Sequence, residues 1–161
     1  MSDYGLDDVS VVMGSYNEAE AIGPVLTDIE EATDGEAEVV VVDGSSDGTA
    51  DIARDHGATV IEQEPQGYGY AVCAALLAAT NPVRITTDCD GTYPMERIPD
   101  FLEYVNEGYD VVSGDRLYHG AETMPTMNRF GNYAFAGLAS VLGGDHMHDV
   151  TTGMRAYHED V

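Results

Sequence analysis

Short apolar runs alternate with longer stretches that carry apolar residues at helical spacing along most of the chain. The short runs are rich in Val and Ile, which favour strands, and the longer stretches have the period of amphipathic helices. The runs predict strands at residues 9–13, 38–43, 58–61, 83–87 and 109–113, with a loop and a last strand within 149–157. The stretches predict helices at residues 18–33, 49–56, 71–79, 95–106 and 128–142. This alternation is typical of an α/β fold with a mostly parallel, doubly wound sheet and helices on both faces.

The second predicted strand contains four consecutive valines, Val39 to Val42. A strand with one solvated face would alternate apolar and polar residues, so this run indicates a strand that is covered on both faces. No internal repeat or low-complexity linker interrupts the pattern, which changes only at a polar loop over residues 117–127. Because 161 residues suit one sizeable core, we expect a single domain over residues 1–161.

The charge balance is strongly acidic, with 30 Asp and Glu residues against 6 basic residues and a net charge of -24. This charge argues against binding nucleic acid or an anionic membrane through a general basic surface. Acidity of this kind keeps a protein soluble, and concentrated salt would screen the repulsion between the carboxylates. The composition therefore indicates a halophilic source.

The two cysteines, Cys73 and Cys89, are too few for a disulfide framework, and we expect free thiols in a reducing compartment. No stretch approaches the ~20 apolar residues that a membrane span needs. The first residues are acidic and polar, unlike a signal peptide. The expected location is the cytoplasm, with any membrane contact at the cytoplasmic face of the membrane.

Two aspartates one residue apart, Asp88 and Asp90, follow the predicted strand 83–87. Parallel α/β sheets hold their ligands at the carboxyl ends of the strands, so this position suits a binding site. Two carboxylates this close repel each other unless a cation lies between them. A hard divalent ion that also binds a diphosphate fits that requirement. The structural alternative is a polar loop in which Asp90 caps the segment that follows.

The segment Asp43 to Asp51 first resembles a calcium-binding EF-hand loop. That loop needs a glutamate at its twelfth position, where this chain has Arg54, so calcium is excluded. A site for the base and ribose of a nucleotide suits the segment better, with Asp43 accepting hydrogen bonds and Gly44 allowing close approach to the backbone. An ordinary capped turn remains the alternative.

Other polar side chains follow the remaining predicted strands. Tyr16 offers a ring for stacking and Glu18 an acceptor, although Glu18 also suits a helix N-terminus. Arg116 follows an apolar strand, where a guanidinium can clamp a phosphate, and Arg129 begins a predicted helix. The alternative for each Arg is a solvated surface residue. His146 and His148 resemble a metal cluster, but they lack an evident third ligand and are interpreted as loop residues.

Six motifs, in their order and spacing, resemble those of family-2 inverting glycosyltransferases with the glycosyltransferase A (nucleotide-diphospho-sugar transferase) fold. The most similar subgroup is the dolichyl- or polyprenyl-phosphate sugar synthases. The resemblance extends from Ser10 to Tyr157. The motifs are Gly14–Glu18, Val42–Thr49, Gly67–Ala71, Asp88–Pro94, Asp110–Arg116 and Asp149–Arg155.

The resemblance implies transfer of a hexose from a UDP- or GDP-linked sugar to a polyprenyl (dolichyl) phosphate, with inversion. The implied nucleoside-binding residues are Tyr16, Glu18, Val41 and Asp43. Asp88 and Asp90, with the backbone of Cys89 between them, would position Mg2+ or Mn2+ and the diphosphate. Arg116 would contact phosphate near the point of transfer, Arg129 would contact the acceptor phosphate, and Asp149 would lie near the acceptor. The implied catalytic set is Asp88, Asp90, Arg116 and Asp149.

The chain departs from the family pattern at two positions. Gly14 stands where the family usually has Pro, and Val42 stands where the family usually has the first Asp of a pair. Family members also continue beyond Val161, so we expect a catalytic-type domain that is truncated at its C-terminus. Two alternatives stay open: a family-2 enzyme that acts on a sugar hydroxyl, and a non-catalytic nucleotide-sugar binding module. The nucleobase, the sugar and a homodimeric state also stay open.

Overall fold

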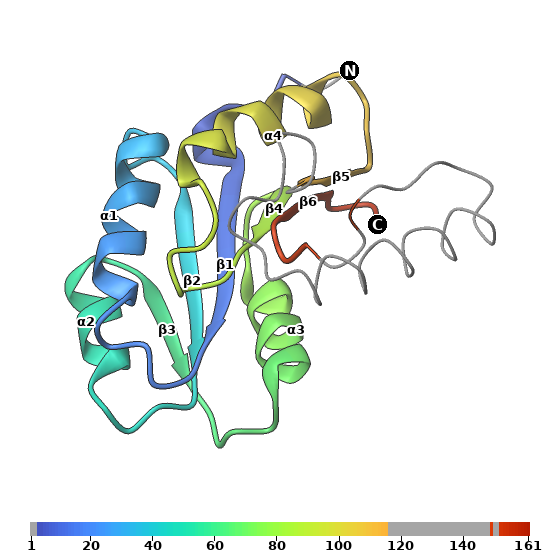
Figure 1. Ribbon diagram of the computed structural model, residues 1–161. Coiled ribbons are helices and arrows are strands. Elements are labelled where there is room, and N and C mark those ends of the chain that lie inside the picture. The colour runs from blue at the N-terminus through green and yellow to red at the C-terminus, as the bar shows by residue number, and fades with distance from the viewer. Residues whose placement is uncertain (1–2, 116–148, 150–151) are drawn as a thin grey trace. The chain divides into compact units, whose positions relative to one another are not determined.

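The computed structural model describes residues 3–115, 149 and 152–161 (Figure 1). Six strands form one sheet in the order β3-β2-β1-β4-β6-β5. The strands are β1 (Val9–Ser15), β2 (Glu38–Asp43), β3 (Thr59–Glu62), β4 (Val83–Thr86), β5 (Val111–Ser113) and β6 (Arg155–His158). The helices are α1 (Ile22–Ala32), α2 (Thr49–Asp55), α3 (Tyr68–Ala78) and α4 (Ile98–Asn106), with 3-10 turns η1 (Leu6–Asp8) and η2 (Met95–Arg97). The chain divides into two compact units, residues 1–112 with 154–161 and residues 113–153.

The core of the sheet is parallel, as the alternation of strands and helices predicts. Strand β1 lies between β2 and β4 and pairs in parallel with both, and β2 pairs in parallel with β3. The predicted last strand exists as β6, which runs antiparallel to β4. The register places Ser15 opposite Asp43 at the carboxyl ends of β1 and β2. The fold is therefore the predicted α/β architecture, with one antiparallel strand added beside β4.

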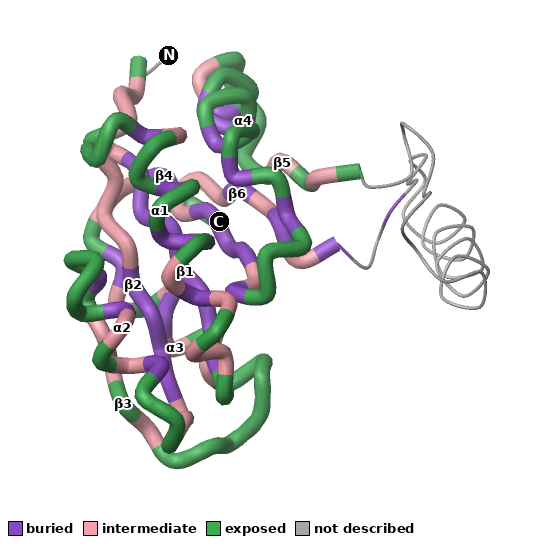
Figure 2. Tube along the Cα trace, turned by 60° about the vertical axis from the view of Figure 1, so that its left-hand side comes forward, coloured by how far each residue is buried: buried purple, intermediate pink, exposed green. Residues whose placement is uncertain are grey.

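Both faces of the sheet are covered, as the four valines predict (Figure 2). Val41 packs into a core cluster with α1 and α4, whereas Val40 and Val42 pack into a second cluster with α3. Side chains along a strand point alternately to opposite faces, so a strand covered on both sides needs apolar residues at every position. The apolar run in the sequence is thus explained by helices on both faces of the sheet.

The 3-10 turn η2 occupies the predicted start of the helix at residues 95–106, so α4 begins only at Ile98. Two further helix starts differ from the prediction. Helix α1 begins at Ile22 and not at residue 18, because residues 17–21 form turns in which Asn17 has a φ of 57° and Ala21 N–H donates to the Glu18 carbonyl at 3.0 Å. Helix α3 begins at Tyr68, three residues before the predicted start at residue 71. Gly67, with a φ of 103°, reverses the chain there, and its carbonyl accepts the N–H groups of residues 70 and 71. Local turn chemistry therefore decided both boundaries.

Gly14 allows α3 to approach the sheet closely. A Cβ atom built on Gly14 would lie 2.7 Å from the Cβ of Ala71, far inside van der Waals contact. The close approach of α3 to β1 therefore leaves no room for a side chain at Gly14.

Gly14→Ala is therefore expected to lower the free energy of unfolding by about 1–3 kcal/mol, the typical effect of overpacking a core. Chemical denaturation in concentrated salt measures this change. Gly69→Ala is the matched control, because a Cβ at Gly69 would meet no atom within 4 Å. Equal stability of both variants would contradict the close packing of α3 on β1.

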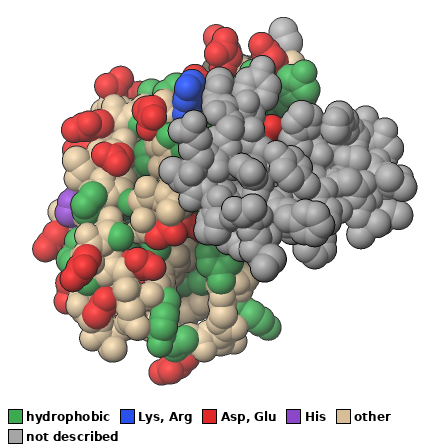
Figure 3. Space-filling model, viewed as in Figure 1, with side chains coloured by type: hydrophobic (Ala, Val, Ile, Leu, Met, Phe, Trp, Pro, Cys, Tyr) green, Lys and Arg blue, Asp and Glu red, His purple; other side chains and the backbone are tan. Residues whose placement is uncertain are grey.

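None of the helices in residues 3–115 and 152–161 combines the length and apolarity needed to cross a bilayer. On the described part of the face in Figure 3, acidic side chains are spread widely, in keeping with the net charge of -24.

Candidate functional site

Asp43 is a buried carboxylate at the carboxyl end of β2, with 2% of its surface exposed. Its Oδ1 accepts hydrogen bonds from the hydroxyls of Ser15 at 2.5 Å and Ser45 at 2.6 Å. Its Oδ2 accepts the backbone N–H of Ser45 at 3.1 Å. A buried charge is stable when it is hydrogen-bonded in this way. Asp43 therefore ties the end of β1 to the loop after β2.

The loops after β1 and β2 are joined by further hydrogen bonds. The backbone N–H groups of residues 17, 18 and 19 donate to Ser45 Oγ at 2.7 Å, Thr49 Oγ1 at 3.0 Å and Asp47 Oδ2 at 3.2 Å. Asp47 also accepts the Thr49 hydroxyl and N–H, which lowers the pKa of Asp47 and ties it to the first residue of α2. Bonds from three successive backbone groups fix the two loops to each other.

The predicted nucleoside-binding residues lie around this junction. The ring of Tyr16 is exposed, Glu18 is half-buried, and Asp43 lies at the base. The side chain of Val41 is fully buried in the core cluster, so only its backbone is available to a ligand. Tyr16 can stack on a base, and Glu18 and Asp43 can accept hydrogen bonds from a nucleoside.

The Asp88–Asp90 segment continues from β4 alongside β1. Thr87 N–H donates to the Val12 carbonyl at 3.1 Å, and the Cys89 thiol faces the Gly14 carbonyl at 3.4 Å. Cys89 is buried, Asp88 is half-buried and Asp90 is exposed. The thiol thus points inward, whereas the carboxylates on either side of it lie nearer the surface.

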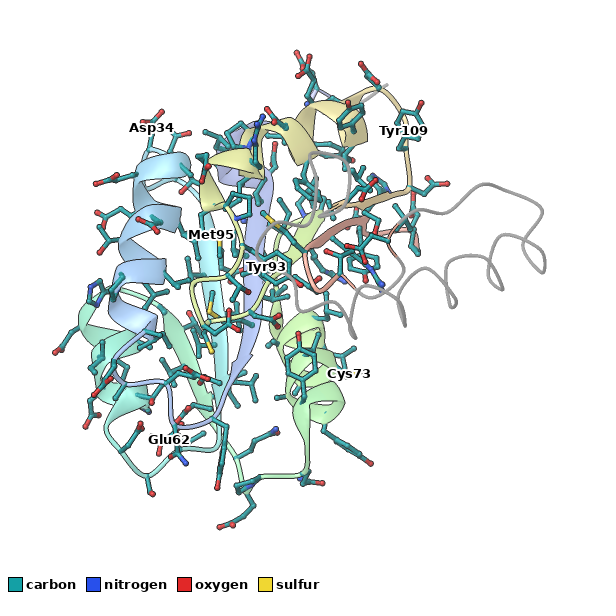
Figure 4. The ribbon with its side chains drawn as sticks, viewed as in Figure 1. Asp34, Glu62, Cys73, Tyr93, Met95 and Tyr109 are labelled. Atoms are coloured by element: carbon teal, nitrogen blue, oxygen red, sulfur yellow. The ribbon has the colours of Figure 1, made fainter. Side chains whose placement is uncertain are left out.

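The two carboxylates have different hydrogen-bond partners. Asp90 Oδ1 accepts the N–H of Thr92 at 3.0 Å and its hydroxyl at 2.7 Å, a turn in which Gly91 has a φ of 73°. Asp88 Oδ1 accepts the hydroxyl of Tyr68 from the first turn of α3. Beyond the turn, Tyr93 and Met95, labelled in Figure 4, are buried in the core cluster and anchor the segment.

The pKa of the Cys89 thiol reflects the burial and the negative charge around this segment. Burial raises the pKa of the Cys89 thiol to about 12. Nearby carboxylates, with Glu18 first among them and then Asp88 and Asp90, add to that rise in pKa. Burial and the charge of Asp88 likewise raise the pKa of Tyr68. Carboxylates from the ends of β1 and β4 therefore act on the same small region, which we call the acidic corner (Glu18, Asp88 and Asp90).

The acidic corner suits a divalent ion that is shared with a ligand. In the part of the chain that the structure describes, no group of three or more His, Cys, Asp and Glu side chains is arranged to hold a metal ion. Mg2+ and similar ions commonly bind one or two carboxylates, and the phosphates of the substrate and water complete the shell. Among the described residues, the hydrogen bonds that Asp88 and Asp90 accept reach their Oδ1 atoms, so their Oδ2 atoms fit that donor set.

Several predicted residues lie outside the described residues: Arg116, Arg129, His146 and His148. Asp149 is buried within the unit of residues 113–153. Arg155 begins β6, and its carbonyl accepts a hydrogen bond from the Thr86 hydroxyl at 3.4 Å.

Sequence reasoning missed three residues of the site: Ser15, Ser45 and Tyr68. The register of two parallel strands would have revealed Ser15, because it lies directly opposite Asp43. Tyr68 lies within the motif Gly67–Ala71, which indicated that it could belong to the site, but the motif alone does not identify its hydrogen-bond partner.

The two cysteines are expected to differ in reactivity. Cys73 is exposed on α3 (Figure 4), whereas Cys89 is 4% exposed and its raised pKa keeps it protonated at pH 8. Because the thiolate is the reactive form, iodoacetamide at pH 8 should modify Cys73 alone in the native protein and both residues after unfolding. Mass spectrometry counts the adducts, and Cys73→Ser should remove the native one. Equal labelling rates for both native thiols would contradict the buried position of Cys89.

The family model described as "Glycosyl transferase family 2" matches residues 10–161. The dolichyl-phosphate hexose transferase of Haloferax volcanii is 65% identical over 161 residues, which cover 100% of this chain and 71% of that protein. Its source supports the halophilic origin that the composition indicates.

Solved structures show the same fold. The mannosyl-3-phosphoglycerate synthase from Rubrobacter xylanophilus has a TM-score of 0.76 at 23% identity, over 94% of this chain and 53% of that one. The glucosyl-3-phosphoglycerate synthase from Mycobacterium tuberculosis, in complex with Mn2+ and UDP-glucose, has a TM-score of 0.70 at 24% identity, over 94% and 56%. This chain thus spans about half the length of these two structures. It belongs to glycosyl transferase family 2 and has the glycosyltransferase A fold, as its motifs predict.

Proposed function

We propose that residues 1–161 form a catalytic-type domain that transfers a hexose, with inversion, from a nucleoside-diphosphate sugar to a polyprenyl phosphate. The observation that carries this proposal is that Asp43 and the acidic corner lie at the carboxyl ends of the adjacent parallel strands β2, β1 and β4, in a chain that is 65% identical to a dolichyl-phosphate hexose transferase. A lipid-linked acceptor would bring the protein to the cytoplasmic face of the membrane during transfer.

The donor would lie along the carboxyl ends of β1, β2 and β4. Tyr16, Glu18, Asp43 and the backbone of Val41 would hold the nucleoside, and the diphosphate would extend toward Asp88 and Asp90. The distribution of side chains supports this direction, because the exposed ring of Tyr16 follows β1 and the acidic corner continues to the end of β4.

Asp88 and Asp90 would hold Mg2+ or Mn2+. Such an ion neutralises the charge that develops on the departing nucleoside diphosphate. The mycobacterial glucosyl-3-phosphoglycerate synthase contains Mn2+ together with its UDP-sugar, which supports the choice of ion. Arg116 would clamp the phosphate near the point of transfer, since a guanidinium forms strong charge-assisted hydrogen bonds.

The acceptor phosphate would need little help from a base. The second pKa of a phosphate monoester is about 6, so the nucleophilic oxygen is already an anion near neutral pH. Arg129 would position that phosphate. Asp149 would lie near the acceptor, where it could serve as the base if the acceptor were a sugar hydroxyl.

Calorimetry in concentrated salt tests the donor site. UDP-glucose, GDP-mannose and related donors are titrated with Mn2+ and with EDTA, and one donor should bind much more tightly with the metal. Transfer of labelled sugar to polyprenyl phosphate, compared with soluble sugars, tests the acceptor. Transfer to a soluble sugar would favour the hydroxyl-acting alternative, and metal-dependent binding without turnover would favour a binding module. Absence of binding for every donor would reject the proposal.

A further inference from the structure

Tyr68 links the first turn of α3 to the acidic corner. Its hydroxyl donates a hydrogen bond to Asp88 Oδ1, across 20 positions of sequence. A phenol is protonated near neutral pH and therefore acts as a donor toward the carboxylate. The bond occupies Oδ1 and leaves Oδ2 of Asp88 as the ligand atom.

The packing of α3 holds the phenol in place. Ala75 and Ala79, at the far end of the helix, are buried against the sheet in the second core cluster. At the near end, Ala71 lies against Gly14, which has no side chain to keep it away. Tyr68 is therefore presented by an element that is fixed at both ends, which is how a preorganised site is built.

Asp88 needs such a partner because its surroundings are negative. Glu18 and Asp90 act on the same region, and carboxylates in proximity repel one another. A free carboxylate would turn away from its neighbours, whereas a donated hydrogen bond holds the side chain in one orientation before a cation arrives. Hydrogen-bonding partners of metal ligands commonly have this role.

We propose that Tyr68 is a positioning residue that orients Asp88 for the divalent ion of the donor complex. The inference rests on the proposed function, because it assumes that Asp88 is a metal ligand. The loss of such a partner typically weakens metal affinity about 10- to 100-fold. Tyr68→Phe removes the hydroxyl and keeps the ring, so it should weaken Mn2+ binding to that extent.

The test is an electron paramagnetic resonance titration of the chain with Mn2+, in the presence of UDP and, separately, of GDP. Tyr68→Phe should raise the dissociation constant for Mn2+ about 10- to 100-fold, while nucleotide affinity in EDTA and the melting temperature stay at their wild-type values. Excess Mn2+ should restore the rate of transfer. Tyr70→Phe is the matched control: it lies two positions along the helix, where side chains point elsewhere, and should bind Mn2+ like the wild type.

The possible failures are distinguishable. If the wild type binds no Mn2+ with either nucleotide, the proposed function and the role of Tyr68 both fall. If the wild type binds Mn2+ and Tyr68→Phe binds it equally well, only the role of Tyr68 is overturned. The role of Tyr68 would also be overturned if Tyr68→Phe lowered both the melting temperature and the nucleotide affinity in EDTA. The hydroxyl would then stabilise the fold and not orient the metal ligand.

Discussion

Asp88→Ala and Asp90→Ala are each expected to slow sugar transfer about a thousandfold or more. A metal ion that neutralises the charge of a leaving group lowers the activation free energy by several kcal/mol, and each 1.36 kcal/mol changes the rate about tenfold. Both carboxylates lie at the acidic corner, and each accepts its hydrogen bonds from described residues at Oδ1. Removing either one would take away half of the ligand set that we propose for the metal. Initial rates at saturating Mn2+ and donor measure the effect.

Asp28→Ala is the control for this pair of variants. Asp28 is exposed on α1, so its replacement changes the net charge equally without touching the corner. It should keep full activity. Nucleotide affinity in EDTA should also stay unchanged in all three variants, because the proposed nucleoside contacts involve other residues. Near-full activity in both Asp88→Ala and Asp90→Ala would rule out this metal site.

Asp43→Ala is expected to reduce both stability and nucleotide binding. It leaves three donors, the Ser15 hydroxyl and the N–H and hydroxyl of Ser45, without their buried acceptor. An unsatisfied buried group costs about 1–3 kcal/mol. Ser45 is only half-buried, so its relaxation reduces the sum, and we expect a loss of about 3 kcal/mol in the free energy of unfolding. Denaturant titration measures stability, and calorimetry measures nucleotide affinity.

Asp43→Asn separates these two effects. Asparagine keeps the shape and one acceptor oxygen, so the two serine hydroxyls keep a partner and part of the stability returns. Its amide group replaces the second acceptor, so nucleotide affinity should stay low. If Asp43→Ala unfolds at the wild-type denaturant concentration and binds nucleotide normally, Asp43 neither joins the loops nor contacts the nucleoside.

The sequence predicted the strands of the parallel core well because burial leaves a direct trace in it. Val9–Ser15 and Glu38–Asp43 each carry four apolar side chains, which fill both core clusters because helices cover both faces of the sheet. The motifs after these strands likewise predicted the family that the comparisons confirm. Helix boundaries were less accurate, since Asn17 and Gly67 set them through positive φ angles that apolar periodicity does not report.

The sequence itself determined the order of strands and helices, the acidic surface and the two clusters of polar residues after β2 and β4. These features are encoded locally, in the spacing of apolar residues and in the composition. Only the tertiary structure decided which of these polar groups meet. It paired Asp43 with Ser15 through the register of β1 and β2, turned Cys89 inward, and placed Tyr68 on Asp88 through the packing of α3. Such contacts join residues that are distant along the chain, so they depend on how the elements pack and not on any local pattern.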